Sequence, residues 1–482
     1  MSVPPARRGK SRFVVARAGL LVLLALPLLA AALPAAAQEG QGQEVLPRFE
    51  PSACPEPLPQ TLRCGYLTVA ENREQPGSLT LRLAVAILPS FGPDPAPDPI
   101  VYLEGRPGGS AVEGFEHWLD SPLLERRELI HFEQRGTRYA EPELDCPELK
   151  ETYVENWQQG LKGEEQVARE VEAAARCQSR LQAAGVDLSA YHSAAIVADL
   201  EDLRQVLGYE TWNLYGISYG TRLALAAMRD QPGGIRSAIL DSTYPPSIDG
   251  LVALAPNTER VVTLLSESCS QDPACGSAYP NLAPNLLELI RQAEAQPMSV
   301  RVRHPDTGEW LRLPVDGQTL LSELFIAFYD SSLIPFLPMV IDEMWQGNKS
   351  PLVPLTDFTL TTYLSGSDGM NISVMCHEEV PFNAPSEIAA ARESVAPELR
   401  SMATLTSTLE ICGLWGAGQA GEVEDQPVSS DVPTLILAGQ FDPITPPAFG
   451  REAARSLPNS FYFEFPGLGH GVTLEPCPLE IA

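Results

Sequence analysis

A serine between two glycines, placed after an apolar run and before a helical pattern, constrains this chain more than any other stretch. The run that begins at Trp212 leads into Gly-Ile-Ser-Tyr-Gly, with Ser218 at its centre. Apolar residues from Leu223 onward then share one helical face until Pro232 ends the pattern. A strand, a sharp turn and a helix in this order strain Ser218 and present its hydroxyl at the helix N-terminus. The helix dipole there favours developing negative charge, so Ser218 is the predicted nucleophile.

Strand patterns alternate with helical patterns on both sides of this stretch. Apolar periodicity predicts helical structure over residues 148–185 and 194–207. Strands are predicted at residues 62–69, 79–88, 100–103, 129–132, 235–240, 432–438 and 461–465. This alternation predicts an α/β fold, with a mostly parallel central sheet flanked by helices on both faces.

The alternation stops between residues 247 and 427, where apolar helical patterns broken by prolines dominate. We interpret that segment as a mainly helical cap inserted over the site. The predicted organisation is a signal peptide at 1–37, a first part of the core at 38–246, the cap at 247–427 and a last part of the core at 428–482.

A serine hydroxyl attacks well only with a base to take its proton and an acid to orient that base. In this architecture the chain order is serine, acid, histidine, each at the carboxyl end of a strand. Asp442 follows the strand at 432–438, and His470 follows the last strand within Gly-His-Gly. Asp442 and His470 are therefore the predicted orienting acid and base.

Elimination supports this choice, because the chain has six histidines. Of these, His470 alone follows a final strand in a glycine-flanked loop. The rivals of Asp442 are Asp316 and Asp431, and Asp431 precedes its strand on the wrong side of the sheet. The other histidines fall in predicted strands, helices, loops or the insertion: His117, His131, His192, His304 and His377.

Acyl transfer also needs two backbone N–H donors for the oxyanion. Tyr219, directly after the nucleophile, is the first predicted donor. The second should come from the glycine-rich loop that follows the strand at 100–103. Arg106 is the preferred residue there and Gly108 the second choice, because Pro107 has no N–H to donate.

The first 37 residues have the pattern of a cleavable secretory signal. Basic residues precede an apolar stretch at 18–32, and three alanines ending at Ala37 offer a small-residue cleavage site. The chain carries a net charge of −29, which repels nucleic acid and anionic lipid headgroups. We therefore expect a secreted, periplasmic or cell-envelope protein without nucleic-acid partners and without membrane contact after cleavage. Its oligomeric state is left open.

Nine cysteines follow the leader, and none forms a Cys-x-x-Cys pair, so no zinc or dithiol redox site is expected. In an exported chain cysteines pair as disulfides. Proximity in the sequence suggests the pairs Cys54–Cys64, Cys146–Cys177, Cys269–Cys275 and Cys376–Cys412, and leaves Cys477 odd.

Six segments together resemble the secreted prolyl- and tripeptidyl-aminopeptidase family of serine exopeptidases, which have the α/β-hydrolase fold. They are residues 104–110, 133–137, 199–208, 215–221, 439–445 and 469–471, within a resemblance that covers most of residues 50–477. The resemblance implies Ser218 as nucleophile, Asp442 as orienting acid and His470 as base. It also implies release of short N-terminal units from peptides, without a metal or a cofactor.

Two departures from the family pattern matter. Arg106 replaces the second glycine of the family's Gly-Gly-Pro-Gly, which keeps the N–H but places a bulky cation beside the pocket. The sequence ends twelve residues after His470, where the family often continues into a further helix and a cysteine that would pair Cys477. An aminopeptidase must also hold a substrate ammonium, and Glu378 and Glu379 in the insertion are candidate partners for it.

Three functions remain open at this point. The first is a secreted serine aminopeptidase that acts through an acyl-enzyme on peptides with a free N-terminus. The second is a carboxylesterase or lactonase of the same fold, which needs no partner for an ammonium group. The third is a non-catalytic binding protein, against which the complete set of Ser218, Asp442 and His470 argues.

Overall fold

A ten-stranded sheet runs through the part of the chain that the structure describes, residues 46–403 and 406–482 of a computed structural model. The predicted signal peptide at 1–37 lies outside the described residues. Across the described residues, every helix is too short or too polar to cross a bilayer. The strand order is β1-β2-β3-β5-β4-β7-β8-β11-β12, with β6 paired to β3. The strands are β1 (Arg48–Ser52), β2 (Arg63–Ala70), β3 (Thr80–Leu88), β4 (Ile100–Leu103), β5 (Leu129–Phe132), β6 (Ala140–Glu141), β7 (Trp212–Ile217), β8 (Ile235–Asp241), β11 (Thr434–Gly439) and β12 (Ser460–Phe465).

The six strands from β5 to β12 in that order run parallel, and β1, β2 and β3 join them antiparallel at one side. The central strands β4, β5 and β7 are buried along their whole length, as expected of strands covered on both faces. Because parallel strands share a direction, the loops after β4, β7, β8, β11 and β12 meet at one edge of the sheet. The predicted catalytic and oxyanion residues lie in, or directly after, these loops: Arg106, Ser218, Tyr219, Asp442 and His470.

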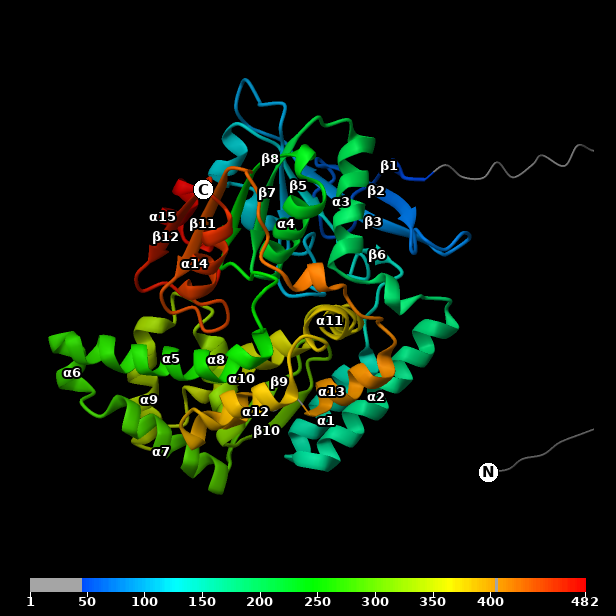
Figure 1. The fold of residues 1–482 in the computed structure, drawn as a ribbon. Helices are drawn as coiled ribbons and strands as arrows, with labels where there is room; N and C mark the ends of the chain where they lie inside the picture. The colour runs from blue at the N-terminus through cyan, green and yellow to red at the C-terminus, as the bar shows by residue number, and fades with distance from the viewer. Residues whose placement is uncertain (1–45, 404–405) are drawn as a thin grey trace, which may run out of the picture. The chain divides into compact units, whose positions relative to one another are not determined.

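Helices cover the sheet, with α3 and α4 in front of the central strands in Figure 1. Helix α4 is buried from Tyr219 to Met228, because it packs between the sheet and the elements around it. The helices beside the sheet or after its last strand are α3 (Ser193–Leu207), α4 (Tyr219–Asp230), α14 (Pro447–Ser456) and α15 (Pro476–Ile481), whereas α1 (Pro147–Gln159) and α2 (Gly163–Ala183) pack on each other and contact β10 (Trp310–Val315) and α13 (Thr406–Trp415) of the insertion.

Residues 250–415 are mainly helical and supply most of a second apolar cluster, which includes Leu265, Leu313 and Leu320. In Figure 1 most of these green to yellow elements gather below the sheet. They are α5 (Gly250–Gln271), α6 (Pro273–Ala278), α7 (Leu282–Ala295), α8 (Gly317–Ala327), α9 (Leu337–Trp345), α10 (Leu352–Leu364), α11 (Asp368–Val374), α12 (Pro385–Glu393) and α13 (Thr406–Trp415), with the hairpin of β9 (Met298–Arg303) and β10 (Trp310–Val315).

The hairpin β9–β10 is missing from the sequence prediction, although its signal is present. Val300 and Val302 are buried while Arg301 and Arg303 are exposed, which is the period of two expected of a half-buried strand. The helical segment predicted over 148–185 is two helices, because Gly160 takes a left-handed conformation at φ 61° and ends α1. Strands β1 and β6 were not predicted either. Both are short and partly exposed, so neither carries a clear hydrophobic pattern.

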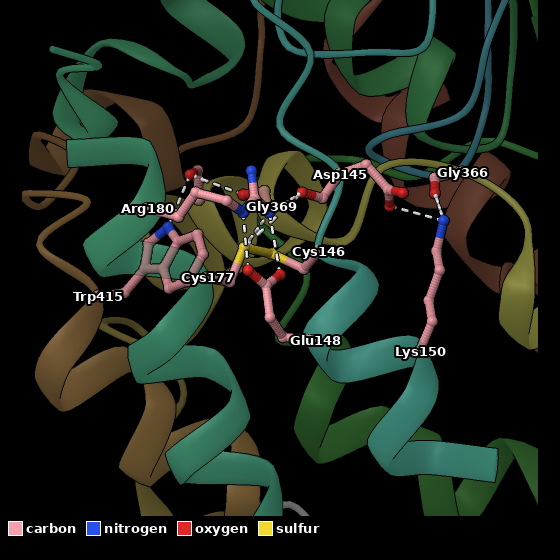
Figure 2. Close-up of a disulfide and its surroundings, with 10 residues drawn as sticks. Asp145, Cys146, Glu148, Lys150, Cys177, Arg180, Gly366, Gly369 and Trp415 are labelled. Carbon is pink, nitrogen blue, oxygen red and sulfur yellow. Dashed lines mark hydrogen bonds and ion pairs between the residues drawn. A yellow bond between two sulfur atoms is a disulfide. The ribbon is translucent and has the colours of Figure 1, made fainter. Parts of the chain in front are cut away.

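The four disulfides have the predicted pairing: Cys54–Cys64, Cys146–Cys177, Cys269–Cys275 and Cys376–Cys412. Figure 2 shows the second of them, which ties the start of α1 to the middle of α2. Arg180 beside it donates to both oxygens of Glu148, at 2.7 and 3.0 Å, so the same two helices are also joined by a two-point ion pair. Cys477 is exposed and has no disulfide partner in the described chain.

Candidate active site

Ser218 stands at the turn between β7 and α4, in a conformation that L-residues rarely adopt. Its φ of 56° and ψ of −122° are those of a sharply strained turn. The backbone around it is packed too closely for side chains: a Cβ on Gly216 would meet the carbonyl of Gly220, and one on Gly220 would meet the carbonyl of Leu103. The turn therefore holds the Ser218 side chain at the carboxyl edge of the sheet, beside the first turn of α4.

Asp442 and His470 are hydrogen-bonded to each other, with 2.8 Å between the carboxylate Oδ2 and the imidazole Nδ1. Asp442 is fully buried, and its Oδ1 accepts from the backbone N–H groups of Ile444 and Thr445 at 3.0 and 2.8 Å. The Thr445 hydroxyl donates to Oδ2 at 2.8 Å and lies 3.2 Å from Nδ1 of the imidazole. The carboxylate and the ring are thus fixed relative to each other by several bonds.

These contacts shift both groups in a direction that suits acid–base work. Burial alone would raise the pKa of Asp442, but the nearby imidazole and the hydrogen bonds it accepts outweigh burial and lower it. Burial alone would lower the pKa of His470, but the charge and hydrogen bond of Asp442 outweigh burial and raise it. The pair therefore favours an ionised carboxylate beside an imidazole that accepts a proton readily.

A second carboxylate, Asp241 at the end of β8, connects the His470 loop to the Ser218 turn. Its backbone carbonyl accepts from the N–H of Ser218 at 2.9 Å. Its side chain accepts from the N–H groups of Val472 and Thr473 at 3.0 and 2.8 Å. The next residue, Ser242, accepts from the N–H of Gly471 at 2.8 Å. The loop that carries His470 and the turn that carries Ser218 are therefore held at the same strand end.

Asp241 was not among the predicted site residues, although it directly follows the predicted strand at 235–240. Its position directly after a buried parallel strand is the same signal that identified Asp442, so the residue could have been considered. Thr445 lies in segment 439–445, one of the six that carry the family resemblance, yet spacing alone does not show that its hydroxyl reaches both Asp442 and His470.

The residues weighed against Asp442 and His470 have other surroundings. Asp316 caps α8 through the N–H of Thr319 and pairs with Lys162 at 2.8 Å. His131 is buried in β5, where its Nδ1 bonds the Ala111 carbonyl and burial lowers its pKa to about 4. Asp431 lies before β11, at the opposite end of the strand from Asp442.

The glycine-rich loop after β4 lies against the Ser218 turn. A Cβ on Gly105 would stand 3.2 Å from the Cβ of Ser218. Gly105 therefore packs directly against the predicted nucleophile, and Arg106 is the next residue in the chain. Arg106 has a φ of 39°, a left-handed value that is uncommon outside glycine. Its guanidinium Nη1 donates to the Thr362 carbonyl and the Ser365 hydroxyl, at 2.6 and 2.7 Å. The predicted cation at the pocket border is thus held against α10.

Tyr219, the other predicted oxyanion donor, is the first residue of α4 and is buried. Its phenol oxygen lies 2.8 Å from the hydroxyl of Ser193 at the start of α3. In the described residues, neither Tyr219 nor Arg106 has an internal acceptor for its backbone N–H. The alternative donor Gly108 has a φ of 93°, and its carbonyl accepts from the N–H of Ser367 at 2.9 Å.

Tyr329, which follows α8, contacts His470 from the insertion and was not predicted. The phenol ring and the imidazole lie with centroids 4.7 Å apart at an interplanar angle of 49°. The neighbouring Ser331 hydroxyl accepts from the N–H of Gly469 at 3.0 Å. The sequence gives no signal for the contact of Tyr329 with His470, because this contact depends on how the insertion packs on the core.

Glu378 and Glu379, the candidates for an ammonium partner, are occupied by the protein itself. Glu378 accepts from both the N–H and the hydroxyl of Ser193, and from Nε of Arg222 at 3.2 Å. Glu379 accepts from Nη1 of the same arginine at 2.6 Å, and Tyr244 lies beside its other oxygen. All three charged side chains are buried, and both glutamates pair with Arg222 of α4, which gives them a structural role that the sequence did not predict.

One group of possible metal ligands occurs in the described residues, at His192, His377 and Glu424, with ligand atoms within 4.8 Å of one another. The two imidazoles are stacked, with centroids 4.3 Å apart and planes inclined by 13°. An imidazole binds a metal in the plane of its ring, so two nearly parallel stacked rings do not converge on one ion. We interpret this group as packing between α3 and the insertion.

Two family models match the chain. Residues 98–266 match the model described as alpha/beta hydrolase fold, and residues 398–478 match the one described as TAP-like protein. The first covers the strands and loops around Ser218. The second covers the region of Asp442 and His470.

Among curated proteins, serine protease Hip1 of Mycobacterium tuberculosis is 23% identical over 445 residues, which span 87% of this chain and 83% of that protein. A tripeptidyl aminopeptidase of Streptomyces lividans is 26% identical over 200 residues, or 40% of this chain and 37% of that protein. The crystal structure of a proline iminopeptidase from Mycobacterium smegmatis has a TM-score of 0.39 and 16% identity, over 86% of this chain and 94% of that one. Together with the sheet order, the family matches and curated relatives confirm the predicted fold: the chain is a serine hydrolase of the α/β-hydrolase fold, and its residues 398–478 are similar to TAP-like proteins.

Proposed function

We propose that this protein is an exported serine aminopeptidase that releases short N-terminal units, of the prolyl or tripeptidyl type, from peptides. The observation that carries the proposal is the 2.8 Å hydrogen bond between Asp442 and His470, in loops tied to the same strand end as the strained Ser218 turn. The names of the curated relatives, a serine protease and a tripeptidyl aminopeptidase, support peptides as substrates.

The proposed chemistry has two halves. His470 takes the proton of the Ser218 hydroxyl as the oxygen attacks the scissile carbonyl, and the N–H groups of Tyr219 and Arg106 stabilise the oxyanion. The C–N bond then breaks, the leaving amine takes the proton from His470, and an acyl-enzyme remains on Ser218. Water, deprotonated by His470, attacks that ester, releases the N-terminal unit as a carboxylate and restores the serine.

We also propose that residues 247–427 act as the cap over this site, between core segments at 38–246 and 428–482. Contacts from the insertion to the catalytic loops support this role. Arg260 of α5 donates to the carbonyls of Gln440 and Asp442, and Tyr329 packs on His470. A cap that touches both loops can exclude water from the reacting groups and limit the length of substrate.

Export is the part of the proposal that concerns residues 1–37. Four disulfides form among the described residues, and such bonds persist in oxidising compartments outside the cytoplasm. Together with the signal-like leader, they support a secreted, periplasmic or cell-envelope location.

A substrate panel tests the proposal against the esterase alternative. We expect the enzyme to cleave tripeptide anilides with a free N-terminus at least about tenfold faster, in kcat/KM, than the same compounds N-acetylated, because one charged hydrogen bond contributes that much. p-Nitrophenyl esters of simple acids serve as the comparison. Equal rates on free and acetylated anilides would remove the exopeptidase claim. Ester cleavage without any anilide cleavage would favour the carboxylesterase or lactonase.

The pH dependence gives a separate prediction. His470 must be neutral to accept the serine proton, and its environment raises its pKa above the ordinary histidine value of 6.5. Activity should therefore be lost as pH falls through this raised pKa, and be restored as pH rises above it. We expect the acid limb of kcat/KM to have its midpoint above 6.5. A profile that is flat from pH 5 to pH 9 would contradict the role of His470 as base.

A further inference from the structure

A cavity of about 400 Å³ lies between α1, the hairpin β9–β10 and the helices α8, α10 and α11. This is within the usual range for pockets that hold small ligands. Its walls are both apolar and charged. Tyr153, Trp157 and Tyr363 line it with aromatic rings, the last two with centroids 6.2 Å apart. The cavity thus offers apolar surface for side chains and polar groups for the ends of a ligand.

This cavity adjoins the proposed oxyanion loop. Arg106 lines it, and the residue before it, Gly105, packs against the Cβ of Ser218. Helix α11 of the insertion contacts the same loop. The Asn371 side chain, also in the cavity wall, donates to the Pro107 carbonyl at 3.1 Å. A peptide whose carbonyl lay at Ser218 could therefore extend its N-terminal part into the cavity.

Three carboxylates line the cavity, and they differ in what they bind. Asp316 is paired with Lys162 and caps α8. Glu170 accepts from the Gln166 amide at 2.9 Å. Asp368, at the start of α11, has a buried Oδ2 with no hydrogen-bond partner in the described chain. A buried carboxylate oxygen without a hydrogen-bond partner is costly, and a cation or donor supplied by a ligand would remove that cost.

The cations around Asp368 are already engaged elsewhere. Lys150 pairs with Asp145 at 2.6 Å and donates to the Gly366 carbonyl at 2.8 Å, as Figure 2 shows. Arg106 donates to Thr362 and Ser365. Both bring positive charge near Asp368 without bonding it. Neither cation therefore bonds the Oδ2 of Asp368.

We propose that Asp368 accepts the α-ammonium of the peptide substrate, in the cavity that receives the residues on the N-terminal side of the scissile bond. This inference rests on the proposed aminopeptidase function and names the group that reads the free N-terminus, in place of Glu378 and Glu379. Burial raises the pKa of Asp368 to about 7, and an ammonium bound beside it would favour the ionised form. The ammonium and the carboxylate then neutralise each other inside the cavity.

The test compares Asp368→Asn with wild type on two tripeptide anilides that differ only in N-acetylation. We expect Asp368→Asn to lower kcat/KM for the free peptide about 10- to 100-fold, since a charge-assisted hydrogen bond is lost. The rate on the acetylated peptide should stay within about twofold of wild type, because that substrate has no ammonium to hold. The isosteric amide keeps the shape of the side chain, and thermal unfolding reports whether the fold is kept.

Glu170→Gln is the matched control, because it removes a carboxylate from the same cavity. It should keep the wild-type ratio of free to acetylated rates. The assignment would be overturned if Glu170→Gln, but not Asp368→Asn, lost the preference for the free over the acetylated anilide. It would also be overturned if Asp368→Asn lowered kcat/KM equally on both substrates. If wild type itself does not distinguish the two substrates, the aminopeptidase function fails. If wild type distinguishes them and Asp368→Asn does so equally well, only the assignment of Asp368 fails.

Discussion

Replacing Ser218 by alanine is expected to lower kcat by about 10⁴-fold or more and to leave the protein folded. The Oγ atom is the group that forms the acyl-enzyme, and no neighbouring hydroxyl occupies the same strained turn. Alanine has the same backbone freedom as serine, so the φ of 56° at this position costs both residues alike. The measurement is turnover of a free tripeptide anilide, with circular dichroism and thermal unfolding as the check on the fold.

Covalent labelling tests Ser218 as the nucleophile without a measurement of turnover. A fluorophosphonate should modify wild type at Ser218, as peptide mapping would show, and should not modify Ser218→Ala. Ser242 provides a demanding control, because it is also a serine with a φ of 56° at the next strand end. Its hydroxyl accepts from the N–H of Gly471, so it serves the loop and should stay unlabelled. Turnover retained in Ser218→Ala, or a label on Ser242, would mean that the nucleophile was misassigned.

The parallel sheet could be predicted from the sequence because its strands are short, apolar and separated by turn residues. The strands 100–103 and 129–132 coincide with β4 and β5, since buried strands between two helical layers carry the strongest pattern. The edge strand β1 was missed, because it is mostly exposed and has only one neighbour, β2. The split between α1 and α2 depends on one glycine, Gly160, which a pattern of apolar positions does not resolve.

In the site, too, the residues at strand ends could be predicted from the sequence, whereas contacts made by tertiary packing could not. The turn at Ser218 and the pair of Asp442 with His470 follow from strand ends, which the sequence displays. The role of Glu378 and Glu379 could not be read in this way, because Arg222 lies more than 150 residues earlier in the chain and reaches them through packing. Burying an arginine requires opposite charge around it, and this requirement uses both glutamates. Packing also decides the surroundings of Asp368, whose Oδ2 it leaves without a hydrogen-bond partner.

Two carboxylates lie at the His470 loop, and their amide variants should have different consequences. Asp442→Asn is expected to lower kcat by about 10⁴-fold, as loss of the orienting acid does in serine hydrolases. An amide can donate to Nδ1, which would leave the proton on the ring nitrogen that must accept from Ser218. Asp241 contacts the backbone of Val472 and Thr473, so Asp241→Asn should destabilise the fold by about 1–3 kcal/mol. Its kcat should fall by no more than about 100-fold.

Comparison of these two variants tests which carboxylate orients the imidazole, because α/β-hydrolases place the acid at the end of a strand and both residues meet that condition. Kinetics on one anilide and urea unfolding of both variants separate the roles. A folded Asp241→Asn that loses as much kcat as Asp442→Asn would make Asp241 the orienting acid. The geometry argues for Asp442, since it bonds Nδ1 of His470 at 2.8 Å whereas the oxygens of Asp241 are taken by backbone N–H groups. The acid limb should also move to lower pH in Asp442→Asn, because the carboxylate that raises the pKa of His470 is then gone.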